Sequence, residues 1–419
     1  MWTERAGGSS GSDRPRLLFL GHSFPYPPDG GVFIRTYNVR RLLSRSFQVT
    51  TLCFDRKGAS APLAERRADM QAMERFGPVE VVELPETVTS HRKVTDHFRS
   101  LVGRRVFTYY KHDSREFESA LHRLLRESAF DIVHVDSLDL SRFLPMVEHL
   151  PVVCTHHNVE SELLSDRSKT ESGARKEYVR LQARLQRGEE ERWCPRVSLN
   201  VTVSDRDRDS LKRIAPEARI ETIPNGVDTE LLVPDWSAET RGIVFVGGLG
   251  WFPNRDALHY FCDDILPAIR TRVGDVETTW VGRAGDDEIH RIGNSYGIRL
   301  TGYVPAIEPF LREAACYVIP MRVGGGTRLK LLDAWAMGKA VVSTTQGAEG
   351  TEAVHGENIW IADNPESFAE GVQRILEDAD LRESLGRKGR ETVERVYSWD
   401  VIGKKQSRDY LSLLGDIHA

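Results

Sequence analysis

The feature that most constrains the fold is an alternation of apolar runs, glycine-containing loops and helical stretches, which occurs twice along the chain. In the first half, the run at residues 16–20 leads through a glycine loop into a helical pattern at 33–44 and a second apolar run. In the second half, the run at 241–246 leads through another glycine loop into a helical pattern at 256–270 and a further run. Strands that alternate with helices form parallel sheets covered on both faces. The sequence therefore predicts an α/β protein with two doubly wound, Rossmann-like domains.

The chain divides into four predicted segments. Residues 1–15 are rich in Gly, Ser and Arg and are expected to form a disordered tail. Residues 16–235 and 236–396 form the two predicted domains, and the polar, proline-containing stretch 233–240 is the hinge between them. Residues 397–419 are expected to form a last helix. Because ligands of such folds bind outside the carboxyl ends of strands, the two domains predict a site in a cleft between them.

Composition excludes several classes of protein. A count of 57 Lys and Arg against 62 Asp and Glu gives a net charge of −5, which does not favour a nucleic-acid partner. Mean hydropathy is −0.40 and we find no apolar run long enough for a transmembrane helix. The amino-terminal tail lacks the apolar core of a secretory signal. The five cysteines form no C-x-x-C pair and several lie in apolar runs, which predicts buried free thiols and a cytoplasmic location.

The most informative motif is a strand, glycine loop, helix and strand in the second half of the chain. Ala315–Ile319 is a short apolar run typical of a buried strand, and three glycines follow at 324–326. Glycine permits positive φ angles and close approach of a ligand to the backbone. Thr327–Met337 is rich in Leu, Ala and Met, which predicts a helix, and Gly338 is placed to end it.

This motif predicts an anion site. Free N–H groups and the positive end of a helix dipole suit a phosphate group, and two basic side chains add charge in the first turn. A tight turn with solvated basic residues is the alternative. We favour the anion site because glycines, cations and an apolar helix coincide. The candidate residues are Gly325, Gly326, Thr327, Arg328 and Lys330.

The same segment resembles the donor-binding motif of retaining glycosyltransferases of the GT-B architecture, glycosyltransferase family 4. That motif has a spaced pair of glutamates, the second followed by Ala, Met and a small residue. Residues 333–338, DAWAMG, match its second half with Asp for Glu, and Gly325 stands at the first-glutamate position. A subgroup that reads GGGTR-x-K fits better. The resemblance implies that Asp333 takes ribose hydroxyls, since a carboxylate accepts two hydrogen bonds from a diol; a solvated helix Asp is the alternative.

The resemblance extends over nearly the whole chain after the tail. Residues 25–31, PYPPDGG, are similar to the family's first glycine loop, which lies against the donor phosphates and the acceptor. Gly30 and Gly31 are the matching positions, and an ordinary turn is the alternative. Residues 223–228, IPNGVD, resemble the segment before the family's hinge, where a turn that positions the linker is the favoured role.

A histidine of the first domain is a candidate for catalysis. Residues 155–161, THHNVES, follow a strand at its carboxyl end, where active residues belong in this fold class. The family has a histidine there that faces the donor sugar, and His157, directly before Asn158, matches better than His156. The resemblance implies that His157 holds a sugar hydroxyl or stabilises developing positive charge, while a structural histidine is the alternative.

Two more segments of the second domain resemble the donor side of the family. Residues 301–304, TGYV, are similar to the segment whose backbone reads the nucleobase, and Tyr303 is expected to lie along the base. The loop at 247–255 contains Gly248, a candidate donor-binding residue, but lacks the Arg and Lys with which many members neutralise the diphosphate. The candidates to replace that pair are Arg328 and Lys330, with Arg283 or Arg322 as helpers.

Three rival motifs fail on their context. The G-x-G at 248–250 begins a dinucleotide fingerprint, but its third glycine position is Pro253. The G-x-S-x-G at 293–297 follows a helix rather than a strand, so Gly297 is better explained as a helix cap. The D-x-D at 205–207 lies where a helix is expected to begin, which favours a cap and first-turn acids. We find no cluster of ligand residues in sequence, so no catalytic metal and no cofactor are expected.

The region 90–116 is basic and interleaved with aromatic residues. It is compatible with an anionic membrane or a lipid-diphosphate acceptor, and equally with an ordinary solvated face. Its basic residues are Arg92, Lys93, Arg99, Arg104, Arg105, Lys111 and Arg115, and its aromatic residues are Phe98, Phe107, Tyr109 and Tyr110.

The resemblance implies a metal-independent, retaining glycosyltransferase that uses a nucleotide-diphosphate sugar and a glycan or lipid-linked acceptor. The first domain would carry the acceptor, the second the donor, and the last helix would cross back to the first. The subgroup features are similar to those of exopolysaccharide- and exosortase-associated enzymes. A sugar-nucleotide 2-epimerase of the same architecture and a non-enzymatic interaction protein on a decayed scaffold stay open as alternatives.

Overall fold

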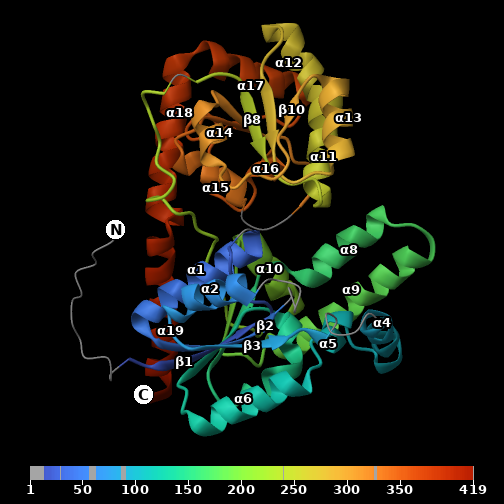
Figure 1. Ribbon diagram of the computed structural model, residues 1–419, viewed down its shortest axis with the longest axis vertical. Helices are drawn as coiled ribbons and strands as arrows, with labels where there is room; N and C mark the ends of the chain where they lie inside the picture. Colours follow the sequence, from blue (N-terminus) through green and yellow to red (C-terminus); the bar gives the residue numbers. More distant parts are fainter. Residues whose placement is uncertain are drawn as a thin grey trace. The chain divides into compact units, whose positions relative to one another are not determined.

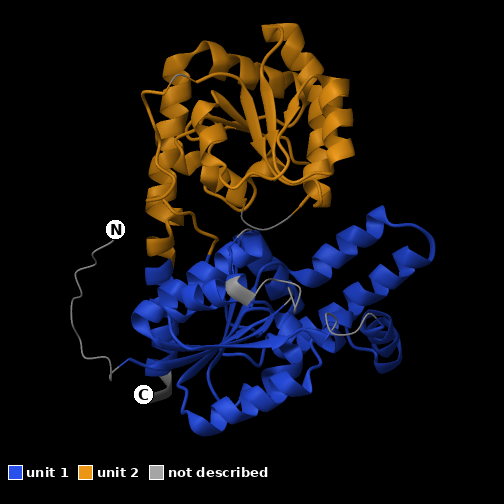
Figure 2. Ribbon diagram, viewed as in Figure 1, with its two compact units in different colours: residues 1–223, 403–419 blue, residues 224–402 orange. Residues whose placement is uncertain are grey.

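The computed structural model describes residues 14–28, 30–55, 63–85, 91–238, 240–324 and 328–418. The chain forms two compact units (Figure 2). Unit 1 comprises the chain up to Ile223 together with Gly403 onward, and unit 2 comprises Pro224–Ile402. The predicted boundaries after residues 235 and 396 fall inside unit 2 as the contacts divide the chain.

Unit 2 begins before the predicted hinge because that part of the chain packs on a helix of unit 2. Arg390 donates to the carbonyls of Leu232, at 2.6 Å, and Thr229, at 2.8 Å. The side chain of Trp236 lies against Gly338, where a Cβ atom would come within 2.5 Å of the indole. The hinge stretch is therefore anchored on the second unit rather than suspended between two domains.

Unit 1 contains a seven-stranded parallel sheet in the order β3-β2-β1-β4-β5-β6-β7. The central strands are buried from end to end, as expected of a parallel sheet covered by helices. The strand order reverses between β1 and β4, which makes this edge a topological switch point. The strands are β1 (Arg16–Gly21), β2 (Gln48–Asp55), β3 (Val79–Glu83), β4 (Ile132–Val135), β5 (Val152–His156), β6 (Leu199–Thr202) and β7 (Ile220–Thr222).

Helices lie against both faces of this sheet (Figure 1). On one face, Phe117 of α6 stacks on Phe54 of β2 with ring centroids 4.4 Å apart and joins the core of the unit. The helices are α1 (Gly31–Ser46), α2 (Leu63–Glu74), α4 (Arg92–Gly103), α5 (Phe107–Lys111), α6 (Arg115–Glu127), η2 (Leu138–Phe143), α7 (Leu144–Val147), α8 (Glu160–Thr170), α9 (Gly173–Trp193) and α10 (Asp205–Ile214).

Unit 2 contains a six-stranded sheet in the order β10-β9-β8-β11-β12-β13, again parallel, with its switch point between β8 and β11. Its core includes Trp280, stacked on Phe245 at 3.7 Å, and the fully buried Trp335. The strands are β8 (Ile243–Val246), β9 (Thr278–Val281), β10 (Arg299–Leu300), β11 (Cys316–Ile319), β12 (Val341–Ser343) and β13 (Trp360–Ile361).

Short loops connect the strands of unit 2 to its helices. Gly338 has a φ of 64° and directly follows the last turn after α15, which confirms the predicted helix end. The helices are α11 (Phe252–Tyr260), η3 (Phe261–Ile265), α12 (Leu266–Val273), α13 (Asp286–Tyr296), α14 (Glu308–Glu313), α15 (Leu329–Ala336), α16 (Thr345–Ala348), α17 (Pro365–Glu377), α18 (Ala379–Thr392) and η4 (Val393–Tyr397).

The last helix, α19 (Trp399–His418), starts in unit 2 and continues into unit 1. Gly403 lies so close to Leu42 of α1 that a Cβ atom would come within 2.9 Å of that side chain. Further along, the hydroxyl of Tyr410 lies 2.7 Å from Nδ1 of His134. The predicted return of the last helix to the first domain is thereby confirmed, as is the predicted α/β class with two Rossmann-like sheets.

Two predicted helices differ in detail from the observed ones. The charge density of residues 170–193 predicts one long solvated helix; α9 is that helix, but it buries polar residues such as Gln182 and Glu189. The helix predicted at 256–270 is interrupted by the π-helical turn η3. Pro267, in the first turn of α12, has no N–H to continue a regular helix, which explains a change of hydrogen bonding at this point.

Local predictions about caps and cysteines are confirmed. Gly297 has a φ of 65° and ends α13, so the G-x-S-x-G match is a helix cap. Ser204 caps α10 by accepting from the N–H of Asp207, and both acids of the D-x-D lie in the first turn. All five cysteines are free and buried, and burial raises the pKa of Cys53 to about 12.

Candidate functional site

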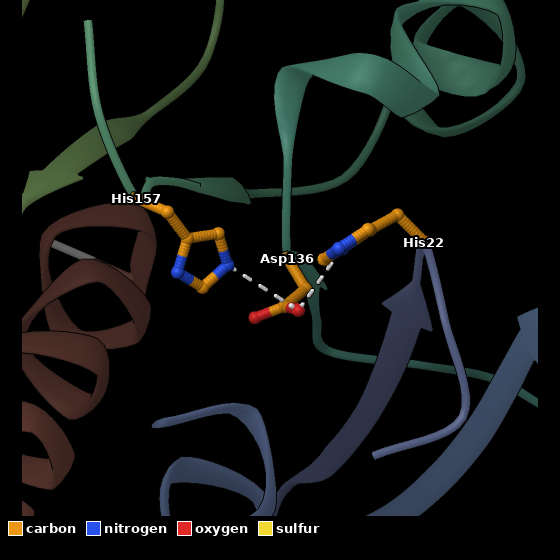
Figure 3. A group of neighbouring side chains, drawn as sticks. All are labelled: His22, Asp136 and His157. Carbon is orange, nitrogen blue, oxygen red and sulfur yellow. Dashed lines mark ion pairs between the residues drawn. The ribbon is translucent and has the colours of Figure 1, made fainter. Parts of the chain in front are cut away.

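Three side chains meet at the carboxyl ends of three adjacent strands of unit 1. His22 follows β1, Asp136 follows β4 and His157 follows β5, and the neighbouring register of these strands brings the three residues together (Figure 3). Nδ1 of His22 lies 3.3 Å and Nε2 of His157 lies 3.5 Å from Oδ2 of Asp136. This edge is the switch point of the sheet, where ligands of doubly wound folds bind.

Asp136 is the centre of this cluster. Its side chain is buried, and Oδ2 accepts a hydrogen bond of 2.7 Å from the hydroxyl of Thr36 on α1. Nε2 of His134 lies 3.6 Å from Oδ1. The three histidine contacts, at 3.3–3.6 Å, are longer than typical hydrogen bonds.

The protonation of Asp136 follows from these neighbours. Burial alone raises the pKa of this carboxyl, but the charge of His157 and the contacts with His134, His157 and His22 together lower the pKa well below its usual value. Asp136 is therefore a carboxylate throughout the physiological range. A buried negative charge at this edge favours cationic or hydrogen-bond-donating partners.

The structure distinguishes the two adjacent histidines of the THHN motif. His156 is the last residue of β5, is buried, and contacts Oδ1 of Asn200 through Nε2 at 2.9 Å. Burial lowers the pKa of His156 to about 4, so it stays neutral and supports the sheet. His157 lies past the strand end, where its ring approaches that of His22 with centroids 5.7 Å apart.

The predicted glycine loop of unit 1 leads into the helix that supports this cluster. Gly30 caps α1 through its carbonyl, which accepts from the N–H of Ile34 at 2.8 Å, and Gly31 is the first helical residue. Thr36, one turn further on, contacts Asp136. The helix that starts at Gly30 and Gly31 therefore reaches the three-residue cluster in its second turn.

The cluster has the composition of a metal site. The ligand atoms of His22, Asp136 and His157 lie within 4.8 Å of one another, and two imidazoles with a carboxylate can hold a divalent ion. This group could not be recognised in the sequence, because its members come from three separate strand ends. The expectation that ligand residues do not cluster is corrected here for His22, Asp136 and His157; whether turnover needs a metal stays a prediction.

An acidic side chain three residues after His157 was also missed in the sequence. Burial raises the pKa of Glu160, at the start of α8, to about 7, and the charge of Asp139 raises it further. Asn158 donates to Glu160 at 3.2 Å. A carboxyl group with a pKa near neutrality is suited to exchange a proton with a hydroxyl substrate. The signal in sequence was only its place in the motif THHNVES.

In unit 2, Lys330 lies beside the glycine loop that follows β8. Its ammonium group donates to Oδ1 of Asn254 at 2.6 Å and lies 4.3 Å from the ring centroid of Phe245. Asn254 in turn donates to the carbonyl of Gly248 at 2.9 Å. The first turn of α15 is thus joined to the loop after the first strand. Lys330, from a distant segment, therefore lies beside the loop that lacks the usual basic pair in sequence.

The surroundings of Lys330 change its acidity. Burial lowers its pKa from 10.5 to about 7, and the charge of Arg328 lowers it further, while Asp333 acts in the opposite direction. A lysine amine that is only half-protonated at neutral pH becomes fully protonated when an anion binds beside it. Lys330 is therefore suited to a ligand that brings negative charge.

Arg328 takes part in holding the loop. Its guanidinium group donates to the carbonyls of Gly324, at 2.7 Å, and Gln346, at 3.0 Å, and is almost completely buried. Its Nη2 lies 3.8 Å from a carboxylate oxygen of Glu349. These contacts fix the two ends of the glycine loop, so any contribution of Arg328 to a ligand includes this positioning of the backbone. Residues 325–327, with the candidates Gly325, Gly326 and Thr327, lie outside the described residues.

Asp333 lies on α15 one turn after Lys330. Burial raises its pKa from 3.8 to about 7, the nearby Glu308 raises it further, and Lys330 opposes the shift. Oε2 of Glu308 is buried and has no hydrogen-bond partner in the described part of the chain. These two carboxyl groups lie close together and are poorly solvated. Hydroxyl groups, such as those of a ribose diol, could donate the hydrogen bonds that the carboxyl oxygens lack. Glu308 had no sequence signal.

Tyr303 and its neighbour Arg283 form the outer part of the candidate site in unit 2. The ring of Tyr303 is 62% exposed, and the guanidinium carbon of Arg283 lies 4.5 Å from its centroid. By contrast, Arg322 forms an ion pair with Asp256 at 2.7 Å. Of the two arginines suggested to assist Arg328 and Lys330, Arg283 lies beside Tyr303, which is predicted to contact the base. Arg322 instead pairs with Asp256 on α11.

The fold and these strand-end sites together define a class. Two Rossmann-like units in one chain, each with candidate ligand residues at its strand ends, have the architecture of a GT-B glycosyltransferase. None of the helices in the described parts of the chain has the length and apolar character of a membrane span.

Family models match both units. Residues 29–231 match the family described as Glycosyltransferase Family 4, and residues 240–378 match Glycosyl transferases group 1. Together these matches cover well over half of the chain, which belongs to the family-4 glycosyltransferases. It is 26% identical, over 216 residues, to the GDP-mannose-dependent alpha-(1-6)-phosphatidylinositol monomannoside mannosyltransferase of Mycobacterium tuberculosis, covering 45% of this chain and 55% of that protein. The chain spans about a third to just over half of the length of such curated relatives.

Solved structures confirm the fold. Sucrose-phosphate synthase from Thermosynechococcus elongatus superimposes with a TM-score of 0.70 at 14% identity, covering 96% of this chain and all of that one. Anabaena HepE in complex with UDP gives a TM-score of 0.66 at 14% identity, covering 95% of this chain and 100% of that one. At this identity the likeness supports the GT-B fold and no finer property.

Proposed function

We propose that this protein transfers a sugar from a nucleotide-diphosphate sugar to a glycan or lipid-linked acceptor, with retention of the anomeric configuration and without a metal. The observation that carries the proposal is the placement of Lys330 against the β8 glycine loop through Asn254. This arrangement supplies positive charge at a switch point, where a diphosphate is expected to bind. Asp333 is proposed to take the ribose hydroxyls and Tyr303 to lie along the base.

The leaving diphosphate is the group that most needs stabilisation in such a transfer. Lys330, with a pKa of about 7, is proposed to take up a proton as the donor binds and to oppose the charge that develops on the phosphate. Arg328 is proposed to hold the loop whose amides, together with Gly248, line the phosphates. In a front-face mechanism the leaving phosphate oxygen takes the acceptor's proton, so no separate base is needed.

Unit 1 is proposed to serve the acceptor and the transferred sugar. His157 is proposed to contact a sugar hydroxyl or to stabilise positive charge on the sugar ring, and Asp136 to hold His22 and His157 in place. Gly30 and Gly31 are proposed to allow close approach of donor phosphates and acceptor. We assign the chain to bacterial surface polysaccharide or lipid-linked glycan synthesis, in the exopolysaccharide- and exosortase-associated subgroup, with a cytoplasmic location and peripheral contact with the membrane face.

The relatives support particular donors. The Mycobacterium tuberculosis relative is GDP-mannose-dependent, and HepE was solved with UDP-glucose. We therefore expect a UDP- or GDP-sugar. Incubating the protein with UDP-, GDP- and ADP-sugars without acceptor should release free sugar slowly from one of them, first in the anomeric form of the donor, as read by proton NMR. Conversion of the donor to its C2 epimer would establish the epimerase instead, and absence of any turnover or binding would favour the decayed scaffold.

A further inference from the structure

Helix α4 has the reverse of the usual distribution of side chains. A surface helix normally buries its apolar stripe and exposes its polar residues. In α4 the fully buried residues are Asp96 and Ser100. The apolar side chains fall on one face at positions i, i+4, i+7 and i+8 and are exposed. They are Val94, Phe98, Leu101 and Val102, with exposed fractions of 71%, 67%, 47% and 69%.

Specific polar contacts fix this orientation. Asp96 forms ion pairs with Arg92 at 2.9 Å and with Arg99 at 3.1 Å. Ser100 accepts from the side-chain amide of Gln182 on α9 at 2.9 Å. Both arginines belong to α4 itself, but Arg92 also donates to the carbonyl of Asp113 at 3.0 Å and Arg99 also pairs with the Asp113 carboxylate. Rotating the helix to bury its apolar face would break these contacts with Asp113 and the contact with Gln182. The exposed stripe is therefore a property of the folded unit.

The charge around the stripe is positive. Asp96 is the one acidic residue of α4, and it is buried, whereas Lys93 and Arg104 at the two ends of the helix are exposed. Ser100 also donates to the carbonyl of Arg105 at 2.7 Å, which joins the helix to a neighbouring hollow. This hollow has a volume of about 390 Å³ and is lined by four arginines and one acidic residue, Glu148. Arg105 pairs with Glu189 and Arg142 with Asp113, so the positive charge of the hollow comes mainly from Arg192 and Arg196.

We propose that α4 docks unit 1 on an anionic lipid bilayer, with the apolar stripe in the interface and the flanking basic residues against lipid phosphates. An apolar face bordered by Lys and Arg is the composition of helices that lie in the membrane plane. Figure 1 shows α4 at the outer edge of unit 1, beside α5. This inference deepens the peripheral contact proposed above by naming its surface and its lipid chemistry.

A second copy of the chain is a poorer occupant of this surface. Packing two α4 faces together would bring Lys93 and Arg104 of both copies near each other, and α4 exposes no acidic side chain to compensate. Like charges on both sides of an interface disfavour association. A lipid surface with phosphate groups provides the missing negative charge.

The test is sedimentation of the full chain with vesicles of phosphatidylcholine alone or mixed with phosphatidylglycerol. We expect binding to the mixed vesicles, weakened by salt, and a loss of about tenfold or more in partitioning for the double variant F98E/L101E. Leu411→Glu is the matched control: this leucine on α19 is 42% exposed, close to Leu101, and its substitution should change binding less than about twofold. Circular dichroism checks that all variants fold.

The other outcomes overturn the proposal. Wild-type protein that does not bind mixed vesicles, or F98E/L101E protein that binds them as well as wild type, would exclude α4 as a lipid surface. If light scattering shows a dimer that F98E/L101E dissociates, the occupant is a second copy. Vesicle binding needs neither donor nor turnover, so failure here leaves the proposed glycosyl transfer standing, and failure of donor binding leaves this proposal standing.

Discussion

At the scale of single residues, the site in unit 2 depends on contacts between distant parts of the sequence. Lys330 and Asn254 are 76 residues apart, yet their contact of 2.6 Å joins α15 to the β8 loop. A lysine held by one neutral partner keeps most of its capacity to attract an anion, whereas an ion-paired arginine such as Arg322 has already satisfied its charge. The proposed donor site therefore depends on Lys330 more than on its neighbours.

Replacing Lys330 by Met should lower kcat/KM for the donor by about 100-fold or more, because a preorganised charge at a developing negative centre contributes about 3 kcal/mol. Lys330→Arg should restore part of the loss. The measurement is donor turnover at subsaturating concentration. Arg322→Met serves as the control and should stay within about twofold of wild type. Equal losses in both variants would show that Lys330 has no special role.

A second prediction concerns the stability of the nucleotide-free protein. The folded-state pKa of Asp333 is raised to about 7 from 3.8, so between these pH values the folded protein binds more protons than the unfolded chain. Stability is therefore lost as pH rises from about 4 to about 7. Asp333→Asn, which cannot ionise, should melt close to wild type at pH 4 and a few degrees higher at pH 8. A melting difference that does not vary with pH would contradict the assigned environment.

At the scale of elements, the sequence allowed the sheets to be predicted but not all of their partners. Apolar runs such as Ala315–Ile319 mark buried parallel strands, and Gly338 and Gly297 mark helix ends, because both signals are local. His157 could be found because it follows a strand. Asp136 and Glu308 could not, since their role arises from neighbours contributed by other elements.

The third prediction concerns the close packing of helices α18 and α15. A Cβ atom at Gly389 of α18 would lie well inside van der Waals contact with Cδ1 of Trp335 on α15, the helix that carries Lys330. Gly389→Ala should therefore destabilise unit 2 by about 1–3 kcal/mol. Gly188→Ala on α9 is the control, because no atom lies within 4 Å of that Cβ, and it should stabilise by about 0.5–1 kcal/mol. Thermal or urea unfolding measures both, and destabilisation by both variants would refute the packing argument.

The strand ends of unit 1 give a fourth prediction. His22, Asp136 and His157 have the composition of a metal site, whereas the proposed mechanism uses charge from Lys330 and backbone amides instead. Turnover should therefore be unchanged after dialysis against EDTA. Loss of turnover in EDTA, restored by a divalent ion in wild type but not in His22→Gln, would place a required metal in this cluster and overturn that part of the mechanism.

At the scale of the whole molecule, the chain combines a conserved class of fold with a departure in its donor motif. Gly325 stands where the family has a glutamate, and Lys330 approaches the β8 loop in which the usual basic pair is missing. We propose that the site with these departures binds a nucleotide-diphosphate sugar. Binding of the donor is therefore the property to measure.

The most direct test is isothermal titration of the full chain with UDP-, GDP- and ADP-sugars in the presence of EDTA, with Lys330→Met titrated in parallel. We predict that a sugar nucleotide of one base binds to wild type and that affinity falls about tenfold or more in Lys330→Met. Absence of binding by any donor to well-folded wild-type protein would contradict the proposed donor site. Binding that Lys330→Met leaves unchanged would show that the donor site lies elsewhere.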